Sequence, residues 1–152
     1  MKVPPSSRRV REHSPSEANR RIDEQTQARL VYFSHQLDLV QGRLEELDRE
    51  WDIERVLEAN AASVTLLSLL GGLMGRRRSL LPWVVAGFLL QHAIQGWCPP
   101  VELFRRLGFR TMREIDQERF ALKALRGDFE NLRPDGKAPL EAARAADQAV
   151  RE

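Results

Sequence analysis

The stretch that decides the fold reads AASVTLLSLLGGLMG over residues 61–75, RRRS over residues 76–79 and LLPWVVAGFLLQHAIQGW over residues 80–97. Neither apolar segment contains a charged residue, and three arginines lie in the short segment between them. A membrane-spanning helix needs about 20 mainly apolar residues, and a single charged residue at its centre costs about 3 kcal/mol. The pattern therefore predicts two helices that cross a membrane as a hairpin.

The bounds of the two predicted spans follow from their lengths. The second segment is long enough by itself, whereas the first reaches the minimum of about 17 residues only if its helix begins near Ile53 or Val56. We therefore expect spans at about 53–75 and 80–97, within a transmembrane hairpin of residues 53–98. The alternative is a soluble helical bundle that has this hairpin as its core.

Tryptophans and arginines flank the predicted spans. The three tryptophans, at positions 51, 83 and 97, fall at the predicted interfaces, where an amphipathic indole is favoured. Seven arginines lie on the two flanks near the spans, and three lie in the loop of residues 76–78. The excess on the flanks predicts a multi-pass protein with both termini in the cytoplasm, although the loop arginines oppose this orientation.

The residues before the hairpin divide into a polar tail and a periodic helix. Residues 1–21 are rich in proline, serine and arginine and poor in apolar residues, which predicts a disordered basic tail. Residues 22–52 repeat apolar residues at alternating steps of three and four, which predicts one long amphipathic, coiled-coil-like helix. Its candidate association seam consists of Leu30, Phe33, Leu37, Val40, Leu44, Leu47 and Trp51.

An apolar seam of this length needs a partner. It forms either a parallel dimer coil or a contact with the carboxy-terminal helix of the same chain, and the sequence leaves both open. A third arrangement, flat on the bilayer, fits less well because the polar face is acidic over residues 45–50. The expected partners are membrane lipid and either a second copy of the chain or another protein of a membrane complex. No nucleic acid is expected, because no aromatic residues are interleaved with the basic residues of the tail.

Two candidate sites lie at the end of the second predicted span. Gln91, His92 and Gln95 form a polar intramembrane cluster that either lines a polar path or ligand site, or hydrogen-bonds between helices and fixes the hairpin. Cys98, the single cysteine, is a candidate thiol between the negative end of one helix and the positive start of the next. A lone cysteine without a histidine and aspartate set is also typical of a structural thiol.

Short amphipathic helices are expected over residues 99–129, on the cytoplasmic side. Proline cannot continue a helix but is favoured at its first position, so one helix is expected to begin at Pro99 or Pro100 and to stop at Gly108.

A second helix is expected from Met112 to Arg126. Thr111 and Glu114 have the spacing of a capping box, and Gly127 provides the stop. Residues 130–152 are expected to be a flexible, Ala-rich tail, because an isolated helix shorter than about 12 to 15 residues is barely stable.

Several of these residues together resemble a known family. Glu54-Arg55-Val56-Leu57 is followed by an apolar run, a short break, Gly87-Phe88-Leu89-Leu90-Gln91, Gly96-Trp97-Cys98-Pro99 and Leu107-Gly108. This order, over about residues 52–111, resembles the YgaP-like transmembrane domain family of small bacterial inner-membrane hairpins of undefined function. The hairpin of that family occurs alone or attached to a rhodanese domain. The resemblance therefore implies a bacterial inner-membrane location and a link to sulfur chemistry at Cys98.

The sequence contains no phosphate loop, zinc-ligand spacing, buried carboxylate pair or nucleophile elbow. We therefore expect no catalysis, no cofactor and no metal. The first functional hypothesis is a small inner-membrane protein whose hairpin anchors a helical cytoplasmic portion used for self-association or for holding a partner. The second is a membrane sulfur or thiol carrier that uses Cys98, and the third is a soluble helical interaction module.

Overall fold

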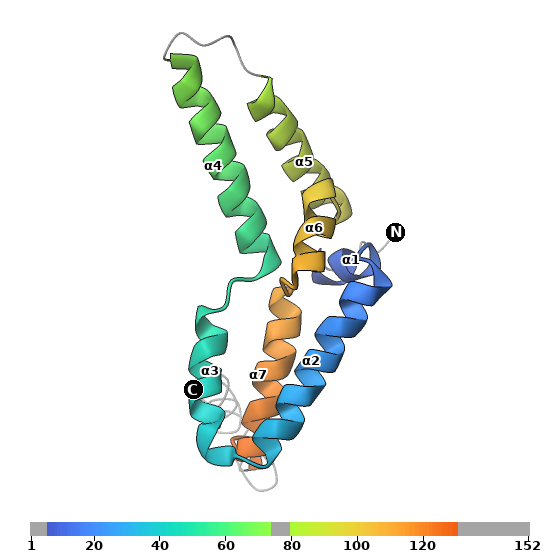
Figure 1. Ribbon diagram of the computed structural model, residues 1–152, viewed down its shortest axis with the longest axis vertical. Coiled ribbons are helices and arrows are strands. Elements are labelled where there is room, and N and C mark those ends of the chain that lie inside the picture. Colours follow the sequence, from blue (N-terminus) through green and yellow to red (C-terminus); the bar gives the residue numbers. More distant parts are fainter. Residues whose placement is uncertain (1–5, 74–79, 131–152) are drawn as a thin grey trace, which may run out of the picture. The chain divides into compact units, whose positions relative to one another are not determined.

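The described chain is all-helical, as the sequence predicts. The computed structural model describes residues 6–73 and 80–130, and these residues contain helices and no strand. Figure 1 shows the elements. They are α1 (Ser6–Glu12), α2 (Ser16–Ser34), the short 3-10 helix η1 (Leu37–Leu39), α3 (Val40–Arg49), α4 (Ile53–Leu73), α5 (Leu81–Gln95), α6 (Pro99–Leu107) and α7 (Met112–Arg126).

The chain divides into two compact units. The first consists of Met1–Gln25 and Glu50–Ile115, and the second consists of Thr26–Arg49 and Asp116–Glu152. Helices α2 and α7 therefore contribute residues to both units.

The first unit is built on the antiparallel helices α4 and α5, with α6 packed against α4 and α1 packed against α5 (Figure 1). Its apolar core is formed by buried residues at the base of this hairpin, with Leu89, Phe104 and Phe109 packed against them. The buried residues are Val10, Ile53, Leu57, Cys98 and Val101. The backbone N–H of Ile53 donates to the carbonyl of Arg110 at 2.8 Å, which ties the start of α4 to the segment before α7.

The ends of α6 and α7 agree with the local signals in the sequence. Helix α6 begins with the two prolines and ends before Gly108, which has a φ of 96° that suits glycine. Helix α7 begins with a reciprocal capping box: the N–H of Thr111 donates to Glu114 at 2.9 Å, and the N–H of Glu114 donates to the Thr111 hydroxyl at 3.3 Å. Both predicted helices are confirmed.

The second unit contains the end of α2, η1, α3 and most of α7. Val40, Leu44 and Leu47 on α3 and Leu122 on α7 are buried. Hydrogen bonds and ion pairs between side chains join α3 to α7 and the end of α2 to α7.

The structure differs from the predicted tail over residues 1–21. Residues 6–12 and 16–21 are helical, and Val10, Ala18 and Ile22 are buried. Few apolar residues suffice here because α1 docks onto a core that other helices supply. Residues 1–5 and nearly all of the predicted tail over 130–152 lie outside the described residues.

The predicted single helix over residues 22–52 is also wrong. Helix α2 ends at Ser34, η1 follows, and α3 begins at Val40. The Ser34 hydroxyl donates to the carbonyl of Val31 at 2.7 Å, and Gln36 has a non-helical backbone with a φ of −138° and a ψ of 67°. The backbone at Gln36 does not continue the helix, so α2 and α3 are separate elements.

The predicted hairpin is present, but the structure does not support two complete spans. Within residues 6–73 and 80–130, no helix combines the length and the apolar character required to cross a membrane. Helix α5 has 15 residues where the prediction extended over 80–97, and α4 carries charged residues in its first two turns. The arginines of residues 76–78 lie outside the described residues.

Candidate functional site

The outer half of the hairpin exposes large apolar side chains. On α4 they are Val64, Leu66, Leu67, Leu69 and Leu70, and on α5 they are Leu81, Trp83, Val84, Phe88, Leu90 and Ile94. We call this set the hairpin surface. Successive residues on a helix are separated by about 100°, so these positions are distributed around α5 and do not form one stripe. Accordingly, no described residue of α5 is buried.

A pocket lies at the base of the hairpin, between α4, α5 and α6, and we call it the hairpin pocket. Its volume is about 120 Å³. Apolar side chains line most of it, among them Leu57, Ala61 and Val64 of α4, Val85 and Leu89 of α5, and Phe104 of α6. The sequence did not suggest this pocket, because it forms where three helices meet.

The predicted polar cluster of Gln91, His92 and Gln95 is only partly assembled. The Gln91 amide Nε2 donates to Gln95 Oε1 at 3.4 Å, so these two residues lie one turn apart on the same side of α5. His92 is half-buried, and its Nδ1 has no hydrogen-bond partner among the described residues. The two glutamines therefore satisfy each other within one helix and do not reach a second helix through this bond.

The candidate thiol of Cys98 is fully buried, with none of its surface exposed. It belongs to the core at the base of the hairpin, next to Val10, Ile53 and Val101. Burial raises the pKa of the Cys98 thiol, and the backbone N–H of Val101 opposes this only in part. A buried thiol with a raised pKa is a poor nucleophile, so the geometry is that of a structural cysteine.

The predicted association seam is divided between buried and exposed positions. Val40, Leu44 and Leu47 are buried within the chain, and Leu30 and Phe33 are partly buried. Leu37 and Trp51 are 50% and 46% exposed. The middle of the seam is therefore buried within one chain.

Sequence reasoning missed a buried charge cluster in the first unit, centred on Arg105. This side chain is fully buried, and its two terminal nitrogens donate to the carboxylate oxygens of Glu114 at 2.6 and 2.9 Å. Nη2 also donates to Asn19 Oδ1 at 2.6 Å, and Nη1 donates to the carbonyl of Phe109 at 3.1 Å. Arg11 Nη1 donates to Glu114 Oε1 at 3.0 Å. The cluster thereby joins residues of α1, α2, α6 and α7.

The carboxylate of Glu114 is held in its charged form by this cluster. Burial by itself would raise the pKa of Glu114, but the hydrogen bonds and positive charge of Arg105, with the hydrogen bonds of Thr111, lower it below its usual value. Glu114 thus serves both as the capping residue of α7 and as the partner of a buried arginine.

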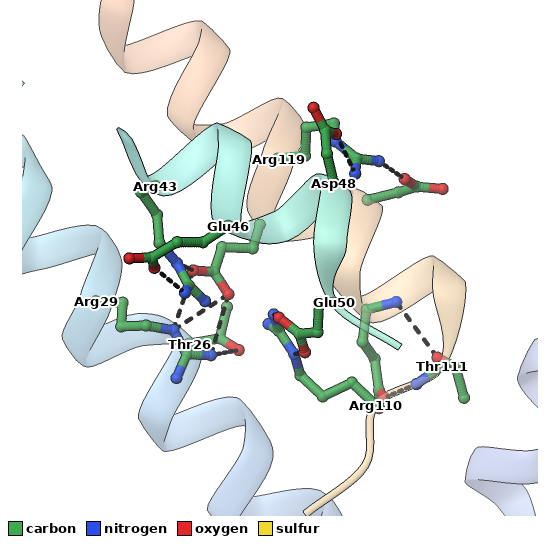
Figure 2. A network of polar contacts seen from close by, with 12 residues as sticks. Thr26, Arg29, Arg43, Glu46, Asp48, Glu50, Arg110, Thr111 and Arg119 are labelled. Atoms are coloured by element: carbon green, nitrogen blue, oxygen red, sulfur yellow. Dashed lines mark hydrogen bonds and ion pairs between the residues drawn. The ribbon is translucent and has the colours of Figure 1, made fainter. Parts of the chain in front are cut away.

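The second unit contains a similar cluster around Glu118. This carboxylate is fully buried and accepts from Arg29 Nε at 3.0 Å and from Arg43 Nε at 2.9 Å, and Figure 2 shows the two arginines side by side. Arg43 also donates to Glu46 at 2.8 Å. Residues of α2, α3 and α7 therefore share one buried carboxylate.

The acidic stretch at the end of α3 pairs with arginines of the chain. Arg119 donates to Asp48 at 2.9 Å, and within the first unit Arg110 forms a two-bonded pair with Glu50 at 2.7 and 2.6 Å (Figure 2). Among residues 6–73 and 80–130, no group of histidine, cysteine and carboxylate side chains is arranged to hold a metal ion. The described polar clusters are thus arginine and carboxylate clusters that join helices.

Comparison with models of known protein families, with curated proteins and with solved structures gives no match to this chain. The function must therefore be argued from the hairpin surface and the polar clusters themselves.

Proposed function

We propose that the protein is a membrane anchor whose α4 and α5 hairpin inserts into lipid and whose remaining helices form a scaffold for self-association or for holding a partner protein. One observation carries this proposal: α5 is apolar on all sides between Leu81 and Leu90, and no described residue of this helix is buried. A helix that is apolar all round is stable only in an apolar environment. For α5, this environment must come from outside the described chain.

The exposed area is large in energetic terms. Leu67, Trp83 and Leu90 are 69%, 78% and 62% exposed. Burying one such side chain is worth about 1.5–3 kcal/mol. The hairpin surface contains several such residues. The free energy lost by exposing them to water is therefore comparable with the whole free energy of unfolding of a typical protein, about 5–15 kcal/mol.

The distribution of residues favours lipid over a docked protein. A helix that docks onto a partner protein usually keeps a polar face towards water, whereas residues 81–90 of α5 contain no charged or amide side chain. The exposed Trp83 near the start of α5 fits the preference of indoles for a membrane interface. The location that we propose, the bacterial inner membrane, is the one implied by the resemblance of residues 52–111 to the YgaP-like hairpins.

Helix α5 is shorter than the hydrocarbon core of a typical bilayer. Its 15 residues extend over about 22 Å, less than the roughly 30 Å of a typical hydrocarbon core. A helix shorter than the bilayer is accommodated by local thinning of the bilayer or by its flanking residues. The proposed topology keeps both ends of the hairpin, and the helices attached to them, on the cytoplasmic side.

The polar clusters support a scaffold role for the helices outside the hairpin. Arg105 with Glu114 in the first unit, and the buried Glu118 with its two partly buried arginines in the second, fix helices through charge pairs. Removing one partner of such a pair strongly destabilises the folded protein, because the other charge is left without compensation. Each unit therefore presents fixed helices to a second copy of the chain or to another protein.

The experiment that tests the anchor is membrane fractionation of the expressed chain with an alkaline wash. Wild-type protein and the control Leu37→Arg, which alters an exposed leucine of η1, are expected in the membrane pellet. The double variant Leu67→Arg with Leu90→Arg is expected to be released, because a charge in the hydrocarbon costs about 3 kcal/mol per residue. Release of the wild type would refute insertion and support a helical interaction module outside the membrane.

Topology is tested with cysteine labelling. The buried Cys98 is expected to be unreactive in the folded protein. A cysteine introduced at the exposed position 12 (Glu12→Cys) is therefore the thiol that is expected to react with the label. Labelling by an impermeant maleimide from the cytoplasmic side only would agree with the proposed orientation, and labelling from the other side would contradict it. Rapid labelling of Cys98 in the wild type would instead favour the thiol carrier, which its burial and raised pKa now disfavour.

A further inference from the structure

A second pocket lies in the first unit, beside the end of α6, and we call it the α6-end pocket. Its volume is about 220 Å³, and it is lined by Glu50, Trp51, Leu107, Gly108 and Phe109. These residues all belong to the first unit, as does the neighbouring Arg21. A cavity of about 150 Å³ holds one benzene ring. The α6-end pocket therefore has room for a ring that carries a small substituent.

Most of this lining is apolar or aromatic. Trp51 is 46% exposed, and Phe109 packs edge to face on Phe104, with the ring centroids 5.9 Å apart. Glu50 is the acidic residue of the lining, but both of its carboxylate oxygens accept from Arg110, at 2.7 and 2.6 Å (Figure 2). The charge of Glu50 is thus balanced by its partner. The walls therefore suit a flat or apolar part of a ligand.

Two arginines beside the pocket can donate to an anion. Arg21 Nη2 lies 3.8 Å from the position that a Cβ on Gly108 would take, and it donates to the carbonyl of Arg106. The guanidinium of Arg55 lies over the ring of Trp51, 4.4 Å from its centroid, and such stacking leaves the edge of the guanidinium free to donate. In the described part of the chain, neither guanidinium forms an ion pair with a carboxylate.

A cationic ligand is the opposite possibility, because the carboxyl end of a helix carries a partial negative charge. At the end of α6, however, the carbonyl of Arg106 already accepts from Arg21, and Glu50 is paired with Arg110. A guanidinium has more N–H donors than the one bond of Arg21 uses. The acceptors near the pocket are therefore engaged while donors of Arg21 and Arg55 are available, which favours an anion.

We propose that the α6-end pocket binds a small aromatic acid, that is, a flat ring that carries a carboxylate or a phosphate group. The ring packs against Trp51 and Leu107, and the oxyanion accepts hydrogen bonds from Arg21. Gly108 carries no side chain at the point where Arg21 reaches the pocket. A guanidinium binds both carboxylates and phosphates through two parallel hydrogen bonds, which is the chemistry that the two groups share. This inference goes beyond the proposed function and does not depend on insertion of the hairpin into lipid.

The chain offers matched variants for each half of the site. Arg21→Gln removes the proposed contact with the oxyanion, and the control Arg20→Gln removes the neighbouring arginine, which pairs with Glu17 at 2.7 Å. Trp51→Leu removes the aromatic wall, and the control Trp83→Leu removes an exposed tryptophan of α5 that does not line the pocket. The first pair of variants tests the anionic group of the ligand, and the second pair tests its ring.

The experiment measures binding to the full chain in a mild detergent by fluorine NMR, with para-fluorophenyl phosphate and para-fluorophenylacetate as probes. Titration into detergent alone corrects for partitioning. Wild type and both controls are expected to bind a charged probe with dissociation constants that agree within about two-fold. Arg21→Gln is expected to weaken binding at least about ten-fold, because it loses charge-assisted hydrogen bonds. Trp51→Leu is expected to weaken it at least about three-fold, because it loses the aromatic contact.

The inference would be overturned if the wild type bound neither charged probe, or if pocket and control variants bound equally. Equal affinity for the uncharged para-fluorobenzyl alcohol would also overturn it. Binding of only one charged probe, weakened by Arg21→Gln, would support it and identify the anionic group. Thermal unfolding checks that each variant is folded, and if one of Arg21→Gln and Trp51→Leu misfolds, the other still tests the site. Alkaline-washed membranes judge the proposed function separately, so either statement can fail without the other.

Discussion

Replacing the buried arginine of α6 is the sharpest test of how the first unit is held together. In Arg105→Met, the methionine preserves much of the apolar stem but removes the guanidinium that donates to Glu114, Asn19 and the carbonyl of Phe109. Removing one partner of a buried charge pair costs about 3–5 kcal/mol, because the other charge remains buried. Arg11 and Thr111 still contact Glu114, which favours the lower part of this range.

The matched control is the next residue on the same helix. The side chain of Arg106 is 65% exposed and pairs with Glu102 at 2.7 Å in an i,i+4 arrangement. A surface pair of this kind is worth at most about 0.5 kcal/mol. At roughly 3–4 °C per kcal/mol, Arg105→Met is expected to lower the unfolding temperature by about 10–15 °C and Arg106→Met by less than about 2 °C. Thermal unfolding followed by circular dichroism, in the same detergent for all variants, measures both.

The dependence on pH identifies Glu114 as the cause. Its folded-state pKa is lowered in the wild type, so its stabilising contribution is present above the unfolded pKa of about 4.3 and is lost as the pH falls through the folded value. In Arg105→Met, burial dominates and favours the protonated carboxyl. The difference between wild type and Arg105→Met is therefore expected to shrink between pH 7 and pH 4. Equal losses in the two arginine variants, or a difference independent of pH, would refute this account.

Two further substitutions test the second unit and the docking of α1. Glu118→Gln leaves two partly buried arginines facing a neutral amide and is expected to destabilise the chain by about 2–4 kcal/mol. The control Glu46→Gln, at an exposed position, is expected to change the stability by less than about 0.5 kcal/mol, and thermal unfolding measures both. Gly96→Ala is expected to destabilise the chain by at least about 1 kcal/mol and to increase proteolysis of α1, because Gly96 has a φ of 71° and an added Cβ lies 2.3 Å from a side-chain atom of α1. For the control Gly42→Ala in α3, the added Cβ meets nothing within 4 Å, and the substitution is expected to stabilise the chain by about 0.5–1 kcal/mol.

Helix ends were predictable from the sequence because their signals are local. Two prolines and Gly108 bound α6, and Thr111 with Glu114 marks the start of α7 within four residues of chain. The start of α4 at Ile53 also agrees with the prediction made from the length of the apolar run.

The charge clusters were not predictable because each joins distant parts of the chain. Arg11 and Glu114 are 103 residues apart, and Arg29 and Glu118 are 89 apart. The sequence shows many arginines and carboxylates but does not show which of them meet. Composition also misled the prediction for the amino-terminal residues, since Val10 is buried against a core that includes Cys98, far along the chain.

The heptad pattern was informative in part. Its spacing continues through residues 35 and 36, where the helix breaks, because apolar spacing does not record the non-helical backbone conformation at Gln36. For Cys98, the sequence left a reactive and a structural interpretation open, and complete burial favours the structural one.

The docking of α1 implies an order of events during synthesis. Arg9 contacts the carbonyl of Ile94, and Arg11 contacts Glu114, so the partners of α1 follow it by 85 to 103 residues. At about 5–20 residues per second, a ribosome makes these partners roughly 5–20 s after α1. During that interval the α4 and α5 hairpin emerges while Val10 has no core to enter. Helix α1 is therefore synthesised before the hairpin but docks onto the end of α5 only after α6 and α7 have been synthesised.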